Sequence, residues 1–439
     1  MKPTLSRYLQ HGSALWGLGW EGPVVSIQFY GFHNVFELVV CVPSAQVSQQ
    51  AWKTNSQDYI LVTGGLGFIG SHTSLELLKA GYNVIIADDT SNSFHDVSSK
   101  ILILAKRHFD SHGGHCPKME LHVTNYRDET SMRALFEAHC TSIYPGQKRR
   151  SDIVGVIHFA AFKAVEGSIR EPLKYYQNNV GGLVDLLALL DEFDIKSFIF
   201  SSSAVVYGTL AESVAQLREE HVVHQEEDYE EVDGIIRRAE PGFTGITNPY
   251  GRTKFFGEAI LADLARSDPS WNIVGLRYFN PIGCDPSGLL GEDPRGTPSN
   301  LLPVVVKVIT GQYDELSIYG GDWNTPDGTA IRDFIHVTDL ARGHIAALAA
   351  AQLGGVIGSY RAYNLGTGAG YSVLDVIAAM ETVSQCTVPR RIVARREGDV
   401  QSSVASVIRA KRELRWEATK SLEEACRDVW NYLKINGET

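Results

Sequence analysis

The chain has 439 residues, of which 44% are hydrophobic and 21% charged, as is ordinary for a globular protein of one large or two modest domains. A net charge of −11 argues against a nucleic-acid-binding surface, because such a surface needs a basic patch. The six cysteines lack zinc-ligand or C-x-x-C spacing, and no apolar run is long enough to span a bilayer. We therefore expect a cytoplasmic protein with free thiols, no metal site, and no nucleic-acid or membrane partner.

Residues 1–57 precede the first predicted strand and are rich in aromatic side chains. They lack the charged start, apolar core and small-residue cleavage site of a secretory signal. We expect a poorly ordered N-terminal extension and assign it no function.

The first predicted strand, 58–63, runs directly into a turn that contains Gly64, Gly67 and Gly70. Such glycines allow a close approach of the backbone to a pyrophosphate, and the N-terminus of the following helix offers it free N–H groups. The spacing Gly-x-x-Gly-x-x-Gly is a variant of the commoner Gly-x-Gly-x-x-Gly. The alternative is a turn that only packs the helix on the strand.

The helical pattern closes at Gly81, and the next strand, 83–87, ends in Asp88. An acid at that place can bind the ribose hydroxyls of adenosine, and it repels a 2′-phosphate. The order of strand, glycine turn, helix, strand and acid therefore predicts a dinucleotide site that favours NAD over NADP.

Further strand patterns lie at 119–123, 153–159 and 197–201, with helices between them. This alternation predicts an α/β fold of the Rossmann type, a doubly wound parallel sheet whose functional groups gather at the carboxyl ends of the strands. His158 lies at the end of one such strand, and we interpret it as a core histidine rather than a general base.

The last of these strands leads to Ser203, and Tyr250 and Lys254 follow at the i, i+4 spacing of one helix face. An ammonium beside a phenol favours the phenolate, so Tyr250 can act as a base near neutral pH, with a serine hydroxyl on the same substrate oxygen. Proton transfer at a carbinol oxygen usually accompanies hydride transfer. Alone, the Tyr-x-x-x-Lys pair is equally typical of an exposed helix surface.

From about residue 282 the elements shorten, and two runs carry arginine near aspartate, at 330–336 and 395–399. Each is either a surface ion pair or a clamp for a diphosphate, and the spacing leaves both open. We expect an NAD-binding domain at 58–281 with an insertion loop at 210–241, and a smaller C-terminal α/β domain at 282–439 that binds the substrate.

Seven motifs in this order resemble those of the UDP-glucose 4-epimerase family, which are extended short-chain dehydrogenase/reductases. They lie at 63–72, 158–160, 201–204, 248–251, 277–281, 291–294 and 396–399. The resemblance implies reversible C4 epimerisation of UDP-galactose and UDP-glucose in galactose metabolism, through a transient 4-keto sugar and bound NADH. It also implies a homodimer through helices around 176–192 and 249–267.

The resemblance implies that Tyr250 is the base, Lys254 its partner and nicotinamide-ribose ligand, and Ser203 the hydroxyl on the sugar oxygen. The other implied cofactor contacts are Gly64, Gly67, Phe68, Ile69, Gly70, Asp88, Phe159, Ala160, Ala161, Lys163, Asn179 and Tyr278. The implied UDP-sugar contacts are Lys163, Ser203, Tyr250, Phe279, Asn280, Asn300, Arg332, Arg396, Asp399 and Ser403.

The chain departs from the family pattern in several places. Ser203 and Tyr250 are 47 positions apart, about twice the usual separation, and we interpret the acidic run at 226–231 within the excess as a solvated loop. The residues at 124–125 replace an acid that often holds the adenine, and Ala161 replaces a glycine. Ser403 stands where some relatives have a tyrosine that restricts the sugar pocket, so we predict activity on UDP-N-acetylhexosamines as well.

Three other functions compete with epimerisation. A dehydratase commonly has Asp-Glu after the catalytic Ser/Thr, whereas Ala204 and Val205 follow Ser203 here and cannot transfer a proton. A decarboxylase needs a site for a glucuronate carboxylate, which no motif provides. A regulatory NAD-binding protein without activity stays open because the insertion falls between two catalytic elements.

Overall fold

The computed structural model describes residues 58–141, 150–231, 234–242, 245–296, 298, 300–353, 356, 359–396 and 398–437. The predicted extension at 1–57 lies outside these residues. Among the described helices, none combines the length and the apolar character needed to cross a bilayer.

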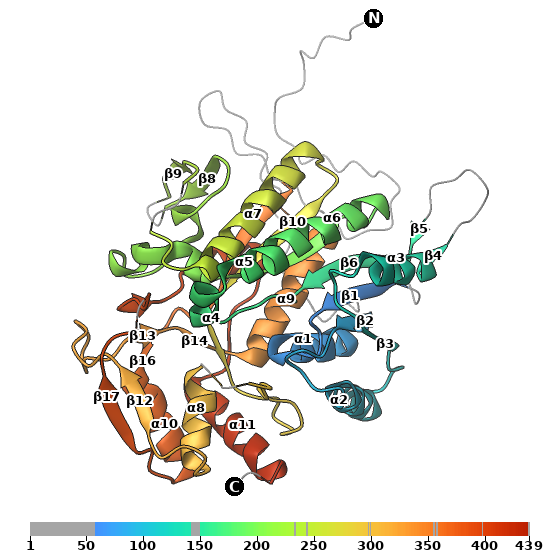
Figure 1. Ribbon diagram of the computed structural model, residues 1–439. Coiled ribbons are helices and arrows are strands. Elements are labelled where there is room, and N and C mark those ends of the chain that lie inside the picture. Colours follow the sequence, from blue (N-terminus) through green and yellow to red (C-terminus); the bar gives the residue numbers. More distant parts are fainter. Residues whose placement is uncertain are drawn as a thin grey trace, which may run out of the picture. The chain divides into compact units, whose positions relative to one another are not determined.

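A seven-stranded sheet in the order β15-β10-β7-β6-β1-β2-β3 forms the centre of the described chain (Figure 1). Every pairing in it is parallel. Its strands are β1 (Tyr59–Thr63), β2 (Asn83–Asp88), β3 (Met119–Val123), β6 (Ile153–His158), β7 (Ser197–Ser203), β10 (Asn272–Tyr278) and β15 (Tyr360–Leu365). The first five match the predicted strands, and the doubly wound Rossmann-type fold is confirmed.

Helices cover both faces of this sheet (Figure 1). One face carries α1 (Phe68–Lys79), α2 (Val97–His112) and α9 (Val337–Gln352). The other carries α3 (Glu129–Ala138), α4 (Val165–Arg170), α5 (Pro172–Tyr175), the π-helical turn η1 (Tyr176–Gly181), α6 (Gly182–Glu192) and α7 (Pro249–Ser267).

The strands carry apolar side chains on both faces of the sheet, because helices bury both faces. Ile60 and Val62 of β1 belong to the core cluster under α1 and α9, whereas Tyr59 and Leu61 point into the cluster under α3 and α6. Alternation along the strand places them on opposite faces. The direction in which the strand order proceeds reverses between β1 and β6. In open α/β sheets, ligands bind at such a reversal, outside the carboxyl ends of the strands.

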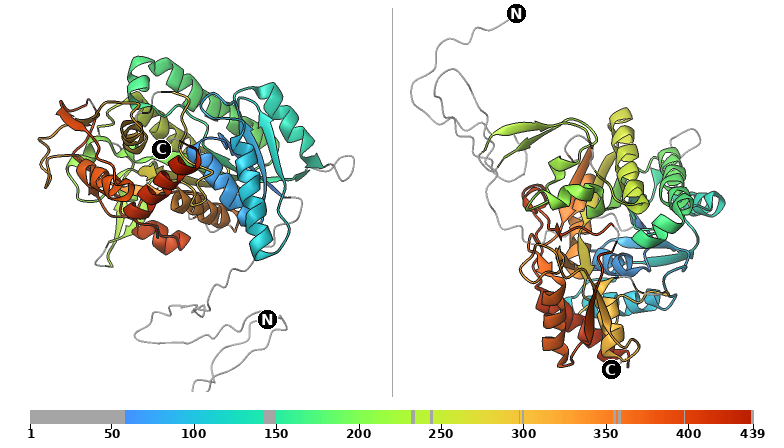
Figure 2. Two further views of the ribbon diagram at one scale, coloured as in Figure 1. Left: turned by 90° about the horizontal axis from the view of Figure 1, so that it is seen from below. Right: turned by 60° about the vertical axis from the view of Figure 1, so that its left-hand side comes forward.

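A smaller set of elements follows β10, with its own apolar core, and Figure 2 shows its helices gathered near the C-terminus. Its helices are α8 (Leu301–Ile309), α10 (Val373–Ser384) and α11 (Leu422–Ile435), whereas the π-helical turn η4 (Ala410–Leu414) packs on the core of the central sheet. Its short strands are β11 (Asn280–Ile282), β12 (Leu316–Tyr319), β13 (Ile331–Arg332), β14 (Phe334–His336), β16 (Tyr371–Ser372), β17 (Arg390–Val393) and β18 (Ser402–Ser403). Within this stretch α9 and β15 return to the central sheet, so the sheet draws on both sides of the predicted boundary at 281.

The insertion at 210–241 is a structured segment. It contains the end of a 3-10 segment, η2 (Ala204–Glu212), a 3-10 turn, η3 (Glu219–His221), and a hairpin of β8 (Glu227–Glu230) with β9 (Ile236–Ala239). The prediction of a loop at 226–231 is therefore wrong, because most of this run forms β8, but Glu226, Asp228 and Glu230 are exposed to solvent as expected. Arginines from distant parts of the chain face the acidic run: Glu227 lies 3.0 Å from Arg361 and 2.5 Å from Arg409.

A short antiparallel pair, β4 (Cys140–Thr141) and β5 (Arg150–Ser151), extends from the end of α3. No disulfide joins the described cysteines, which are Cys116, Cys140, Cys284, Cys386 and Cys426.

Candidate active site

The glycine turn between β1 and α1 forms a cradle that larger residues would fill. Gly64 has a φ of +71°, and a Cβ there would lie 2.9 Å from the backbone nitrogen of Ala160. A Cβ at Gly70 would lie 2.2 Å from the Gly64 carbonyl oxygen. Gly67 begins α1 without a side-chain cap, and Phe68 and Ile69 form its first turn. The open helix N-terminus and the missing side chains fit the pyrophosphate of NAD.

Asp88 closes this cradle from the end of β2. Its carboxylate accepts hydrogen bonds from Leu66 N (3.0 Å), Thr90 N (2.9 Å) and Ser93 Oγ (2.8 Å). A carboxylate has about four lone-pair sites, so one stays available for a ribose hydroxyl. Asp88 thus shapes the turn and can also hold the adenosine ribose.

The backbone after β6 completes the cofactor side. Phe159 N and Ala160 N both donate to the Thr63 carbonyl, at 3.0 and 3.2 Å, which brings this segment against the glycine turn. His158 is 2% exposed and its Nδ1 lies 2.7 Å from Thr63 Oγ1. Burial lowers the pKa of His158 to about 3, so the ring is neutral, and its interpretation as a core histidine is confirmed.

Asn179 and Lys163 have protein partners of their own. The Asn179 amide accepts from Phe162 N and donates to Phe162 O and to Thr253 Oγ1, all between 2.9 and 3.1 Å. It therefore positions the segment that contains Ala161 and Phe162 against α7. Lys163 is half exposed, and its Nζ lies 3.4 Å from Glu292.

Ser203, Tyr250 and Lys254 meet where β7 ends and α7 begins. Asn248 caps α7 by accepting from Gly251 N at 2.9 Å, which orients its first turn. The Tyr250 hydroxyl shares a hydrogen bond with the Ser203 side chain. Lys254 Nζ donates to the Ser201 carbonyl and lies 5.9 Å from the centre of the Tyr250 ring. The predicted catalytic group is thus brought together on the elements expected.

The protonation states differ from the sequence-based expectation. Burial raises the pKa of Tyr250 to about 12, against the opposing effect of its Ser203 hydrogen bond. Burial also lowers the pKa of Lys254 to about 7, although Glu258 opposes this shift. Desolvation disfavours both charged forms, so it opposes the effect of the neighbouring ammonium, which favours the phenolate. A stable phenolate needs a further positive charge near the ring.

Glu258 is a buried carboxylate beside the predicted catalytic group that the sequence motifs do not include. It is fully buried, accepts from Ser202 Oγ, and lies 2.7 Å from Arg277 and 2.9 Å from His224. Burial alone would raise the pKa of Glu258, but Arg277 outweighs it and holds the pKa well below its usual range. This carboxylate joins β7, α7, β10 and the insertion. Its place one helical turn after Lys254 was the available signal.

Tyr278 and Phe279 lie at the end of β10, beside the catalytic strand. Tyr278 pairs in register with Ser203, and its hydroxyl hydrogen-bonds His344 Nε2. Phe279 is 7% exposed and packs in a small core with Val206 and Tyr207. Both residues therefore support the floor of the predicted sugar site.

The arginines on the substrate side face one another across two short strands. Arg332 on β13 pairs in register with Ser403 on β18. Arg396 and Asp399, 3.2 Å apart, belong to a loop that Thr247 contacts through the Gly398 carbonyl. Asp333 does not pair with Arg332: it is buried and accepts hydrogen bonds from the backbone of Thr367, Gly368 and Ala405.

Within the described residues, Arg332 has no carboxylate within 4.0 Å. Burial lowers the pKa of Arg332, which marks the cost of removing its charge from water. Two arginines against one aspartate leave a net positive charge, which suits a diphosphate. The alternative of a surface ion pair is thereby excluded for Arg332 but describes the contact of Arg396 with Asp399.

The remaining substrate residues lie nearby. Asn280 on β11 donates its backbone N–H to the Asp333 carbonyl at 2.9 Å, so it neighbours Arg332. Asn300 begins α8 and donates to Glu292 at 2.8 Å, the carboxylate that also contacts Lys163. Asn125, one of the two residues that replace the acid of the family pattern, donates from its Nδ2 to Asp89 at 2.9 Å.

Comparison with known proteins agrees with this geometry. Residues 60–366 match the model of the NAD dependent epimerase/dehydratase family. UDP-glucose 4-epimerase from Dictyostelium discoideum is 43% identical over 86% of this chain and 96% of its own length. The bovine UDP-glucose 4-epimerase is 42% identical over 86% of this chain and 97% of its own length.

Among solved structures, UDP-glucose 4-epimerase from Bifidobacterium longum in complex with NAD+ and UDP superposes with a TM-score of 0.73. Its sequence is 38% identical, and the match covers 87% of this chain and 99% of that one. The glycine cradle, the Ser203–Tyr250–Lys254 group and these similarities agree, and the chain belongs to the NAD dependent epimerase/dehydratase family, within its UDP-glucose 4-epimerases.

Proposed function

We infer that the chain catalyses the reversible C4 epimerisation of UDP-galactose and UDP-glucose in galactose metabolism, with NAD as its cofactor. The observation that carries this inference is the position of Tyr250, Ser203 and Lys254 at the carboxyl edge of the sheet, next to the glycine cradle. The relatives and the solved structure named above support the same reaction.

The chain's own residues supply proton transfer. When bound, NAD supplies the hydride acceptor and donor at the sugar C4, and its nicotinamide brings the positive charge that favours the Tyr250 phenolate. Tyr250 then accepts the C4 hydroxyl proton, while Ser203, hydrogen-bonded to Tyr250, holds the same oxygen. Lys254, fixed by the Ser201 carbonyl, adds its charge below its pKa of about 7.

The substrate side explains how both faces of a sugar can be reached. Arg332 and Arg396 hold the diphosphate of the UDP group, with Asn280 beside Arg332. A firmly held nucleotide leaves the 4-keto sugar free to turn about its diphosphate link and present its other face to Tyr250. Inversion at C4 follows when the proton and hydride return to that face.

The test is to incubate the purified protein with UDP-galactose without added NAD, and to identify the nucleotide released when the protein is denatured. The expected result is UDP-glucose formation and released NAD. A dehydratase would instead give a stable 4-keto, 6-deoxy product, a decarboxylase would act only on UDP-glucuronate, and a regulatory protein would release NAD but convert nothing.

We also propose that UDP-N-acetylhexosamines are substrates. Ser403 pairs with Arg332 in register and so lies close to the diphosphate site, where its small side chain leaves room for an acetamido group. The direct test is turnover of UDP-N-acetylgalactosamine by the wild-type protein.

A homodimer in the cytoplasm is the expected assembly and location. Exposed apolar side chains on α5, α6 and α7 support the dimer: Leu173 is 74% exposed, Val184 46% and Phe256 41%. These helices lie together on one face of the sheet, as Figure 1 shows. The free thiols described above agree with a reducing compartment. Sedimentation of the purified protein tests the dimer.

A further inference from the structure

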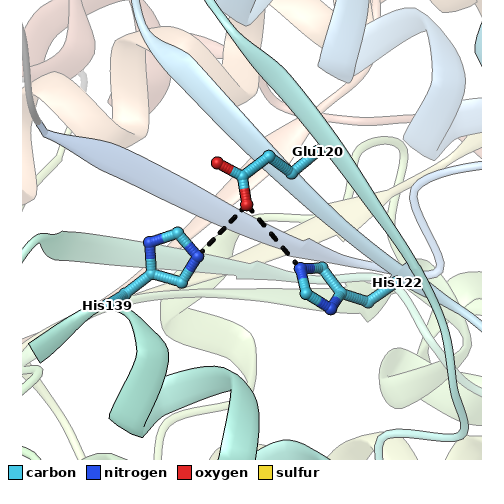
Figure 3. A group of neighbouring side chains, drawn as sticks. All are labelled: Glu120, His122 and His139. Atoms are coloured by element: carbon cyan, nitrogen blue, oxygen red, sulfur yellow. Dashed lines mark ion pairs between the residues drawn. The ribbon is translucent and has the colours of Figure 1, made fainter.

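Glu120, His122 and His139 form a cluster outside the active site (Figure 3). Glu120 and His122 are alternate residues of β3, the edge strand, so their side chains point to the same face of the sheet. His139 is the residue that ends α3, on that face. Figure 3 shows the three side chains converging, with Glu120 between the two rings.

The distances fit a single metal ion. Glu120 Oε2 lies 3.3 Å from His139 Nε2 and 3.8 Å from His122 Nε2, and one ligand atom of each residue lies within 4.8 Å of the others. Zinc bonds of about 2.0–2.1 Å at tetrahedral angles place neighbouring ligand atoms roughly 3.3–3.4 Å apart. Small rotations of His122 are enough to reach this geometry.

The surroundings favour a bound cation. His139 stands at the C-terminus of α3, where the helix dipole attracts positive charge. Tyr59 hydrogen-bonds Glu120 and its ring lies 4.9 Å from that of His139, so both ligands are held by a neighbour. Such support is typical of metal sites. The side chains of His122 and Glu120 are 36% and 38% exposed, which lets an ion enter and water complete its shell.

We propose that Glu120, His122 and His139 bind one divalent transition-metal ion, with zinc the best match to two imidazoles and a carboxylate. The ion would link the edge strand β3 to the end of α3. The site is structural and separate from epimerisation, since Glu120 and His122 lie on the edge strand β3 and His139 ends α3, elements that carry none of the predicted epimerisation residues. Scattered sequence positions, 120, 122 and 139, explain why the sequence predicted no metal.

Cobalt titration of the purified full-length protein tests the site, because tetrahedral Co²⁺ has a visible spectrum that zinc abolishes by displacement. The expected result is saturation near one equivalent. His122→Ala and His139→Gln should each abolish the spectrum, and Tyr59→Phe should weaken binding about tenfold. The matched control is His108→Ala, since His108 and His112 stack 4.3 Å apart on α2 and offer two imidazoles but no carboxylate.

His122 is the deciding position, because it is half-exposed and its replacement leaves the core intact. His122→Ala should keep wild-type turnover of UDP-galactose, which shows that the fold survives. The proposal is overturned if the wild-type protein gives no tetrahedral spectrum, if His122→Ala binds cobalt as before, or if His108→Ala alone removes it. Zinc should raise the thermal unfolding midpoint of the wild type but not of His122→Ala.

Discussion

The cofactor side and the substrate side of the site are built in different ways. The cradle for NAD comes from one short stretch, Gly64 to Gly70, closed by Asp88 a strand later. The substrate side is assembled from β13, β18 and the loop at 396–399, which meet only through tertiary contacts. A local motif therefore specifies the cofactor side, whereas the substrate side depends on how strands that are distant in the sequence pair.

The difference extends to electrostatics. On the cofactor side, the charge of Asp88 is compensated by backbone and hydroxyl donors of its own neighbourhood. On the substrate side, Arg332 lacks a carboxylate partner within the described residues, because Asp333 turns to backbone N–H groups. The charged group of the cofactor side is thus balanced by the protein itself. On the substrate side, the charge of Arg332 is balanced only when an anion binds.

Tyr250 lies between the two sides, and its replacement should have the largest effect. Tyr250→Phe removes only the proton acceptor, so kcat should fall about 10²- to 10⁴-fold while NAD stays bound and UDP still binds. The measurements are turnover of UDP-galactose, NAD content and UDP affinity. Tyr82→Phe is the control, because Tyr82 is another buried tyrosine, its hydroxyl donates to Gln352 Oε1 at 3.3 Å, and the variant should keep full activity. Near wild-type turnover by Tyr250→Phe contradicts its role as base.

Replacing Arg332 should affect the substrate side alone. Arg332→Gln removes a charged donor, which is worth about 1.5–3 kcal/mol, or roughly a ten- to hundredfold rise in KM for UDP-galactose. Arg332→Lys should recover part of this, because it keeps the charge but loses the planar fork. NAD content should stay unchanged in both variants. A fall in NAD content with an unchanged KM would show that Arg332 contributes to cofactor binding, which contradicts its role in binding the substrate.

Gly70→Ala makes the converse change on the cofactor side. The added Cβ would lie 2.2 Å from the Gly64 carbonyl oxygen, so the turn must shift. Overpacking of this kind costs about 1–3 kcal/mol, which corresponds to a loss of NAD affinity of roughly five- to hundredfold. The affinity for UDP, measured by calorimetry, should be preserved. Gly81→Ala is the control, because that glycine has open space around it and lies at the far end of α1, although its φ of +94° adds local strain.

The sequence predicted those parts of the fold that depend on neighbouring residues. The first five strands of the sheet, the glycine turn and the spacing of Tyr250 and Lys254 all follow from local patterns. The sequence does not predict the pairing of Glu227, because its partners Arg361 and Arg409 lie more than 100 positions away. The sequence does not predict the role of Glu258 in the buried network either, since Arg277 and His224 lie on other elements and become its partners only after folding.

The protonation of the catalytic pair shows a second limit. Spacing shows that Lys254 can lie beside Tyr250, but it does not show how much water either group loses. Burial raises the pKa of Tyr250 and lowers that of Lys254, which opposes the effect expected from their proximity. Proximity is a local property of a helix, whereas desolvation depends on the whole fold.

The smallest expected effect is a change of selectivity at Ser403. Ser403→Tyr should keep turnover of UDP-galactose and lose that of UDP-N-acetylgalactosamine, because the larger ring occupies the space for the acetamido group. Ser402→Tyr is the matched control: Ser402 is the neighbouring residue of β18, pairs with Ile331, and points to the opposite side of the strand. It should leave the ratio of the two activities unchanged.

The ratio of the two activities distinguishes a change in the volume of the sugar pocket at Ser403 from a disturbance of the charged group at Arg332. Ser403 adjoins Arg332, so a variant that disturbed the diphosphate clamp would raise KM for both sugars equally. A loss confined to the acetylated substrate therefore identifies a limit on volume beside an intact clamp. The contradicting outcome is that both the wild type and Ser403→Tyr convert UDP-galactose while neither converts the acetylated sugar. In that case a residue other than Ser403, outside β18, limits the volume of the sugar pocket.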